Sequence, residues 1–146
     1  MLKLFKNNQH KHHLLKAFSN CFNALKDELG NVPVKMQSSH EITGSVLGSC
    51  RGYAIANKIN ESHFNLIVDA VFEELFRRES VSVQTKTEKW LRTEDETFML
   101  AYYYAKSKAI KSKTLDLSWR SDYAGKHFKA GHQVMFDIIY AISPCS

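Results

Sequence analysis

The chain has 146 residues, of which 44% are apolar and 24% are charged. This balance is close to the average for soluble globular proteins, so it excludes a disordered chain, a collagen-like repeat and a small disulfide-stapled scaffold. Twenty lysine and arginine residues against fifteen acidic ones give a net charge of +5, which permits an anionic partner without requiring one. The length predicts a single domain over residues 1–146 with its own hydrophobic core, with residues 1–9 open to fraying.

The cysteine pattern and the hydropathy bear on the location of the protein. Cys21, Cys50 and Cys145 are widely spaced and form no CxxC motif. The first residues lack the apolar run of a signal peptide, and no stretch approaches the roughly 18 uncharged apolar residues that a membrane span needs. We therefore expect reduced cysteines, a cytoplasmic location and no membrane partner.

The first half of the chain predicts two helices. Apolar residues recur at intervals of three and four over residues 14–29, which places them on one helix face, and Gly30 supplies a C-terminal stop. Ser38 precedes Glu41 by three residues, the spacing of a capping box. A second helix is therefore expected to begin there and to run to about residue 60.

The second half predicts three more helices and two extended segments. The helices are expected at about residues 62–79, 94–110 and 121–142, from their apolar spacing and their capping residues. Apolar and polar residues alternate in residues 80–87 and 114–119, which is typical of extended chain and would allow a minor two-stranded β element. The predicted fold class is mainly α, a compact bundle of about five helices.

A strip of small residues runs along the second predicted helix. Gly44, Gly48, Gly52 and Ala56 are spaced by four, so on a helix they form one smooth face that another helix can approach closely. A tight crossing inside the chain, an interface between subunits and a loop are the three interpretations. The subunit interface, together with an aromatic content of 12%, predicts a homo-oligomer.

One short motif suggests a reaction. Residues 48–52, with the sequence GSCRG, have the outline of a nucleophile elbow in which Cys50 replaces serine. A Cys50-dependent acyl-transfer enzyme would need this thiol on a strand-to-helix turn, His127 or His132 as its base and Asp122 to orient the base. The sequence lacks the alternating strands and helices of such enzymes, and a cysteine between small residues is more often a buried hydrophobe.

The seven histidines do not predict a metal site. His40 and Glu41 would begin an HExxH motif, but Gly44 stands where its second histidine belongs. No Glu-x-x-His pair occurs, and His127 and His132 are five residues apart, so they do not share one edge of a helix. No catalytic residue, metal or cofactor is predicted.

The net charge is distributed unevenly along the chain. Residues 1–36 and 105–146 each carry +4, whereas residues 37–104 carry −3. The C-terminal lysines lie beside aromatic residues, as in surfaces that stack on bases and contact phosphates. The candidate nucleic-acid-binding residues are Tyr104, Lys108, Lys111, Lys113, Trp119, Arg120, Lys126 and Lys129.

These patterns specify no reaction. We expect a small, non-enzymatic binding or regulatory protein that acts through macromolecular interaction, with a protein as its partner and with self-association. A nucleic-acid-binding protein is the alternative, and the Cys50-dependent enzyme is the third hypothesis.

Overall fold

The computed structural model describes residues 2–23 and 26–112, and helices form the regular structure of this part of the chain. The elements are α1 (Leu2–Phe22), α2 (Val34–Gln37), α3 (His40–Ala56), α4 (Glu61–Phe76), the short 3₁₀ helix η2 (Arg77–Glu79), α5 (Ser80–Arg92) and α6 (Glu96–Ser112). The five long helices pack together, and the described residues include no strand. The predicted fold class, a mainly α bundle, is confirmed.

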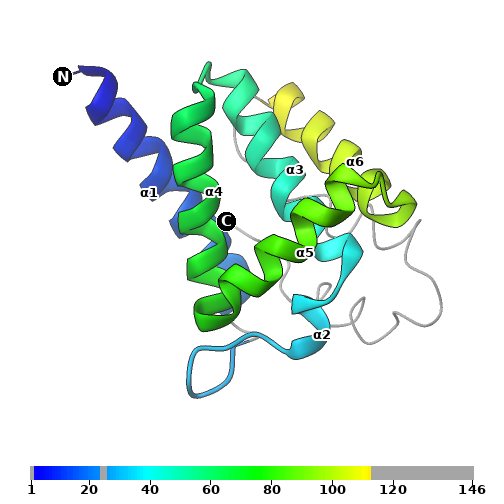
Figure 1. Ribbon diagram of the computed structural model, residues 1–146. Coiled ribbons are helices and arrows are strands. Elements are labelled where there is room, and N and C mark those ends of the chain that lie inside the picture. The colour runs from blue at the N-terminus through cyan, green and yellow to red at the C-terminus, as the bar shows by residue number, and fades with distance from the viewer. Residues whose placement is uncertain (1, 24–25, 113–146) are drawn as a thin grey trace.

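The helices lie side by side across the molecule in the order α1, α4, α3 and α6, and α5 crosses beside them (Figure 1). Helix α3 is central: every residue from Glu41 to Cys50 is buried. The core combines large side chains from α1, α4 and α6, among them Phe18, Phe72 and Phe98. The described residues therefore form one hydrophobic core, with α3 at its centre.

The closest packing joins α3 to α6. A Cβ atom on Gly44, Gly48 or Gly52 would collide with the backbone carbonyl oxygen of, respectively, Phe98, Tyr102 or Lys106. The contacted residues advance in step along both helices, so α3 and α6 run parallel, as Figure 1 also shows. Small residues are thus required on α3, because the two backbones are in direct contact.

Helix α6 contributes small residues of its own to this contact. Buried alanines recur at the same spacing of four, at positions 101, 105 and 109. The first and last of these alanines face glycines of α3. A Cβ atom on Gly44 would lie 3.4 Å from the Cβ of Ala101, and a Cβ atom on Gly52 would lie 2.7 Å from the Cβ of Ala109. The structure therefore has the tight crossing within the chain, and α6 leaves the three glycines no exposed surface for a second subunit. Ala56 is half-buried at the last residue of α3.

Helix α1 differs from its predicted range at both ends. It begins at Leu2 and ends at Phe22, well before Leu29. The side chain of Asp27 accepts hydrogen bonds from the backbone N–H groups of Leu29 and Asn31, both at 2.9 Å, and Gly30 takes a φ of +82°. The aspartate therefore stabilises a turn in a segment whose apolar spacing predicts a helix.

The N-terminal caps lie one or two residues after the predicted ones. Ser39, not Ser38, caps α3 and accepts a hydrogen bond from the N–H of Ile42 at 3.0 Å. Asp95, not Thr93, accepts one from the N–H of Phe98 at 3.0 Å and caps α6. Both helices nevertheless occur where the sequence predicts them.

Residues 80–87 are helical, so the prediction of an extended segment there is wrong. The hydroxyls of Thr85 and Thr87 donate to the carbonyls of Val81 and Val83, four residues earlier, at 2.8 and 2.7 Å. These bonds accommodate threonine in a helix, and Val83 and Thr87 form its buried side. Residues 114–119 and the helix predicted for residues 121–142 lie outside the described residues. Among the residues that are described, no helix has the length and apolar character of a membrane span.

Candidate functional site

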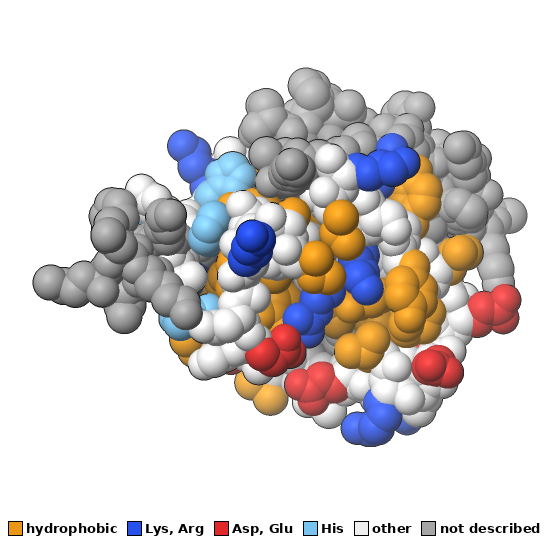
Figure 2. Space-filling model, turned by 90° about the horizontal axis from the view of Figure 1, so that it is seen from above, with side chains coloured by type: hydrophobic (Ala, Val, Ile, Leu, Met, Phe, Trp, Pro, Cys, Tyr) orange, Lys and Arg blue, Asp and Glu red, His pale blue; other side chains and the backbone are white. Residues whose placement is uncertain are grey.

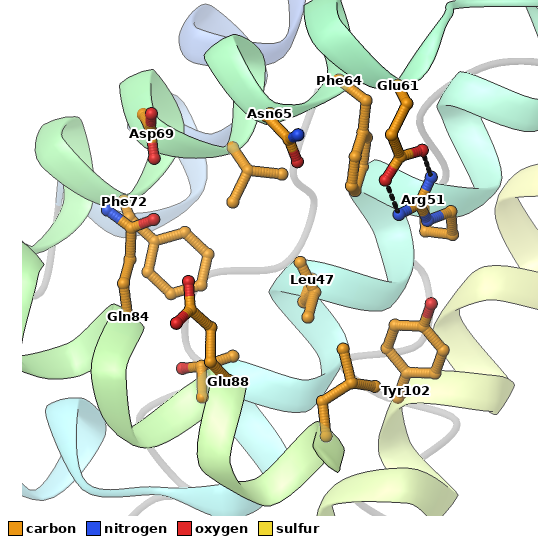
Figure 3. A pocket seen from close by; sticks show the side chains of 13 residues that line it. Leu47, Arg51, Glu61, Phe64, Asn65, Asp69, Phe72, Gln84, Glu88 and Tyr102 are labelled. Atoms are coloured by element: carbon orange, nitrogen blue, oxygen red, sulfur yellow. Dashed lines mark hydrogen bonds and ion pairs between the residues drawn. The ribbon is translucent and has the colours of Figure 1, made fainter.

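A groove of about 420 Å³ opens between α4 and α5, with α3 at its floor and α6 at one end (Figure 3). The residues that line it are Leu47, Arg51, Glu61, Phe64, Asn65, Val68, Asp69, Phe72, Gln84, Thr87, Glu88, Leu91 and Tyr102. Its floor is apolar because buried side chains of α3 and α4, namely Leu47, Phe64, Val68 and Phe72, lie at the base of the groove. We call this cavity the α4/α5 groove.

Polar side chains line both edges of the α4/α5 groove. On α4, Glu61, Asn65 and Asp69 are spaced by four, which places them along one edge of the helix. This row is about 12 Å long at the rise of an α-helix. On α5, Gln84 and Glu88 have the same spacing and form the opposite edge (Figure 3). The groove is therefore elongated, with an apolar floor between two polar rows.

Arg51 is fixed at one end of the groove. Its guanidinium donates two hydrogen bonds to the carboxylate of Glu61, at 2.8 and 3.0 Å, and lies over the ring of Phe64 with 3.6 Å to the centroid. The hydrogen bond with Glu61 is the main cause that raises the pKa of Arg51, and the same bond lowers the pKa of Glu61. Both groups are thus ionised, and each compensates the charge of the other.

The other end of the groove carries uncompensated negative charge. Asp69 on α4 and Glu88 on α5 form no ion pair with any described residue. Arg92, four residues after Glu88, does not line the groove. With Arg51 and Glu61 paired, the described walls of the groove are net acidic.

The face of the molecule that is seen from above carries both apolar and charged side chains (Figure 2). Hydrophobic side chains gather around lysine and arginine side chains in the middle of this face, and acidic side chains lie along its lower edge. Exposed apolar groups therefore adjoin charges of both signs.

Cys50 does not have the surroundings of a nucleophile. It lies inside α3 rather than on a strand-to-helix turn, and it is 1% exposed. Burial raises the pKa of its thiol to about 12, although Arg51 opposes the shift. The thiol is therefore protonated at neutral pH, whereas an acyl transfer by Cys50 would need the thiolate. The other residues proposed for that reaction, Asp122, His127 and His132, lie outside the described residues.

Three of the eight candidate nucleic-acid-binding residues lie on α6. Lys108 places its ammonium 5.8 Å from the ring centroid of Tyr104, one turn earlier, and Lys111 is exposed. Lys106 has similar contacts with the rings of Tyr102 and Tyr103. The other five candidates, Lys113, Trp119, Arg120, Lys126 and Lys129, lie outside the described residues, so this surface stays a prediction.

Two histidines, His10 and His40, have side-chain hydrogen-bond partners outside the groove. His10 is hydrogen-bonded to the hydroxyl of Tyr53 at 2.7 Å, and His40 to the carboxylate of Asp95 at 2.9 Å. The ring of His40 also stacks on Trp90 with 3.9 Å between centroids. Within residues 2–23 and 26–112, no three His, Cys, Asp or Glu side chains come together as metal ligands.

Comparison of the chain with family models, curated proteins and solved structures gives no match. The site is therefore interpreted from its own geometry.

The sequence contains a signal for only one wall of the groove. The spacing by four of Glu61, Asn65 and Asp69 on a predicted helix is sufficient to place them on one edge. The opposite wall could not be found, because residues 80–87 have the alternation of an extended segment. The pairing of Arg51 with Glu61 depends on the turn between α3 and α4, which sequence spacing does not specify.

Proposed function

We propose that this protein is a non-enzymatic interaction protein that binds a segment of a partner protein in the α4/α5 groove. The observation that carries the proposal is an open groove whose apolar floor lies between two polar rows. An apolar centre within a polar rim is the usual anatomy of a protein interface. The proposal keeps the cytoplasmic location that the sequence suggests.

The size of the groove supports recognition of a short segment. A volume of about 420 Å³ accommodates a few side chains, not the face of a whole domain. Stable interfaces bury roughly 800 Å² on each partner, so contact through this groove alone would be weak and reversible. A partner would therefore insert a few anchoring side chains, as in known modes of peptide recognition.

Leu91 provides a direct test, since it lines the groove and its 37% exposure allows substitution without disturbing the core. Leu91→Arg places a long charged side chain at the edge of the apolar floor. The matched control is Leu100→Arg on α6, where the leucine is 50% exposed and does not line the groove. Both variants and the parent protein are used as baits in an extract of the cells that make the protein, and each candidate partner is then purified and retested.

We expect Leu91→Arg to reduce binding of the purified partner at least tenfold, roughly 1.4 kcal/mol, and Leu100→Arg to leave it unchanged. Equal binding by all three proteins would contradict the proposal. Self-association stays a prediction with no assigned surface, because α6 covers the glycine strip.

A further inference from the structure

We propose that the partner segment is a basic amphipathic helix, whose apolar side chains enter the α4/α5 groove and whose lysine or arginine lies opposite Asp69 and Glu88. This inference rests on the proposed function and adds the chemistry of the partner. It follows from the different charges at the two ends of the groove and from the elongated shape between them.

The two ends of the groove differ in whether their charged side chains have an ionic partner. At one end, the cation of Arg51 already has the Glu61 carboxylate and the Phe64 ring as partners. At the other end, Asp69 and Glu88 extend from facing walls, with Gln84 beside them (Figure 3). A ligand therefore finds a neutralised end and an acidic end.

The acidic end of the groove favours a partner with positive charge. Asp69 and Glu88 belong to different helices, and no described lysine or arginine pairs with either of them. Two carboxylates without cationic partners make this end of the groove electronegative, and a cation bound there is attracted by both. An acidic segment would instead be repelled, so charge complementarity favours a basic partner.

The shape of the groove favours a helix. The polar row of α4 repeats every four residues over about two turns, and the apolar floor follows the same line. An amphipathic helix presents apolar side chains at the same intervals of three and four, with charged side chains at the margins of that face. Leu47 and Val68 on the floor would contact its apolar side chains, and Asp69 and Glu88 its basic ones.

The experiment uses three synthetic helices of about 15 residues, the length at which an isolated helix becomes stable. The first has leucine on one face and lysine at the margins of that face. The second replaces each lysine with glutamate, and the third replaces each leucine with serine. Binding to the full chain is measured by fluorescence anisotropy, and the contacted residues are mapped by NMR chemical-shift changes.

We expect the lysine and leucine helix to bind in the groove, shifting the amide signals of Leu47 and Val68, and to bind at least tenfold more tightly than the other two. Asp69→Asn combined with Glu88→Gln should weaken this binding about fivefold, the effect of removing two exposed ion pairs. The control is Glu73→Gln, an exposed acid on α4 outside the groove, which should leave the affinity unchanged. Added salt should weaken the binding of the parent protein but have less effect on the double variant.

Three results would overturn the inference. Equal or tighter binding of the glutamate helix in the groove would assign an acidic partner. If the double variant binds the lysine helix as tightly as the parent protein does, Asp69 and Glu88 have no role in recognition. A dimer in sedimentation experiments that Leu91→Arg dissociates would assign the groove to a second copy of the chain.

The first two results leave the proposed function intact. That function fails separately, if Leu91→Arg and the parent protein bind the purified partner equally.

Discussion

Gly48 marks the closest approach between α3 and α6, since the carbonyl oxygen of Tyr102 occupies the space of its missing side chain. Inside an isolated helix, glycine is about 1 kcal/mol less favourable than alanine. The local preference of the sequence is therefore opposed to what the structure needs at this position. The packing of the two helices has to outweigh this cost.

Gly48→Ala should consequently destabilise the protein, although alanine is the better helix former. The added methyl group would collide with backbone rather than with a movable side chain, so α6 must shift. Overpacking of this kind costs about 1–3 kcal/mol. Urea unfolding followed by circular dichroism gives the free energy of unfolding of the variant and of the parent protein.

Ser49→Ala is the matched control in the same helix. The buried hydroxyl of Ser49 has no hydrogen-bond partner among the described residues, so its removal should leave the stability unchanged or slightly increased. A Gly48→Ala variant as stable as the parent would show that α3 and α6 are not in backbone contact.

Single residues were predicted well where a pattern lies within one helix. The spacing of Gly44, Gly48 and Gly52 predicts a smooth face, and the tight crossing within the chain was among its interpretations. The partner strip of alanines on α6 has the same spacing, but nothing in the sequence connects two strips so far apart. The parallel direction depends on the path through α4 and α5.

At the scale of elements, the parallel arrangement places the N-termini of α3 and α6 at the same end of the molecule. Like ends of two helix dipoles therefore lie near each other, which is unfavourable without nearby negative charge. Asp95 supplies that charge: its carboxylate accepts hydrogen bonds from the N–H of Phe98 and from His40, the first residue of α3. The two helix starts are thus connected through one carboxylate.

Asp95→Asn should make the protein less stable at neutral pH, and the difference should disappear in acid. Burial alone would raise the pKa of Asp95, but the hydrogen bonds from Phe98 and His40 and the charge of His40 together lower it. A native pKa below the unfolded value of about 3.9 means that ionised Asp95 contributes stability above that value. The contribution is lost as the pH falls through the native pKa.

We expect Asp95→Asn to lower the free energy of unfolding by about 0.5–1 kcal/mol at neutral pH, since asparagine keeps the cap but not the charge. Urea unfolding at a series of pH values down to about pH 2 measures this difference. The control is Glu94→Gln, at the neighbouring exposed acid. Its difference in free energy of unfolding from the parent protein should not shrink in this way as the pH falls. A difference between Asp95→Asn and the parent that stays constant with pH would contradict the role of the charge.

The elements also show where prediction from the sequence is reliable. Helix α3 follows from a capping-box spacing and helix α4 from apolar spacing, because both signals are local. Helix α5 does not, because its β-branched residues alternate like a strand and its threonines are accommodated only by bonds to the preceding turn. The predicted number of helices agrees with the structure partly by coincidence: α5 was unexpected, and the helix predicted for residues 121–142 is outside the described residues.

At the scale of the whole molecule, α3 is the element around which the others pack, and Cys50 lies on it between two of the contact glycines. A reagent can reach this thiol only if helices separate, because the side chain is buried and its pKa of about 12 leaves little thiolate at neutral pH. The reactivity of Cys50 therefore reports on opening of the core.

Alkylation of Cys50 in the native protein should be slower than alkylation of a small thiol by several orders of magnitude, in line with the stability of the fold. Mass spectrometry of the Cys50 peptide separates its labelling from that of the other two cysteines. Gly48→Ala should accelerate the labelling, because it weakens the contact that buries the thiol, whereas Leu100→Arg on the exposed side of α6 should not. Rapid labelling at neutral pH that does not respond to Gly48→Ala would mean that Cys50 is accessible and activated, and it would support the hypothesis of a cysteine-dependent enzyme.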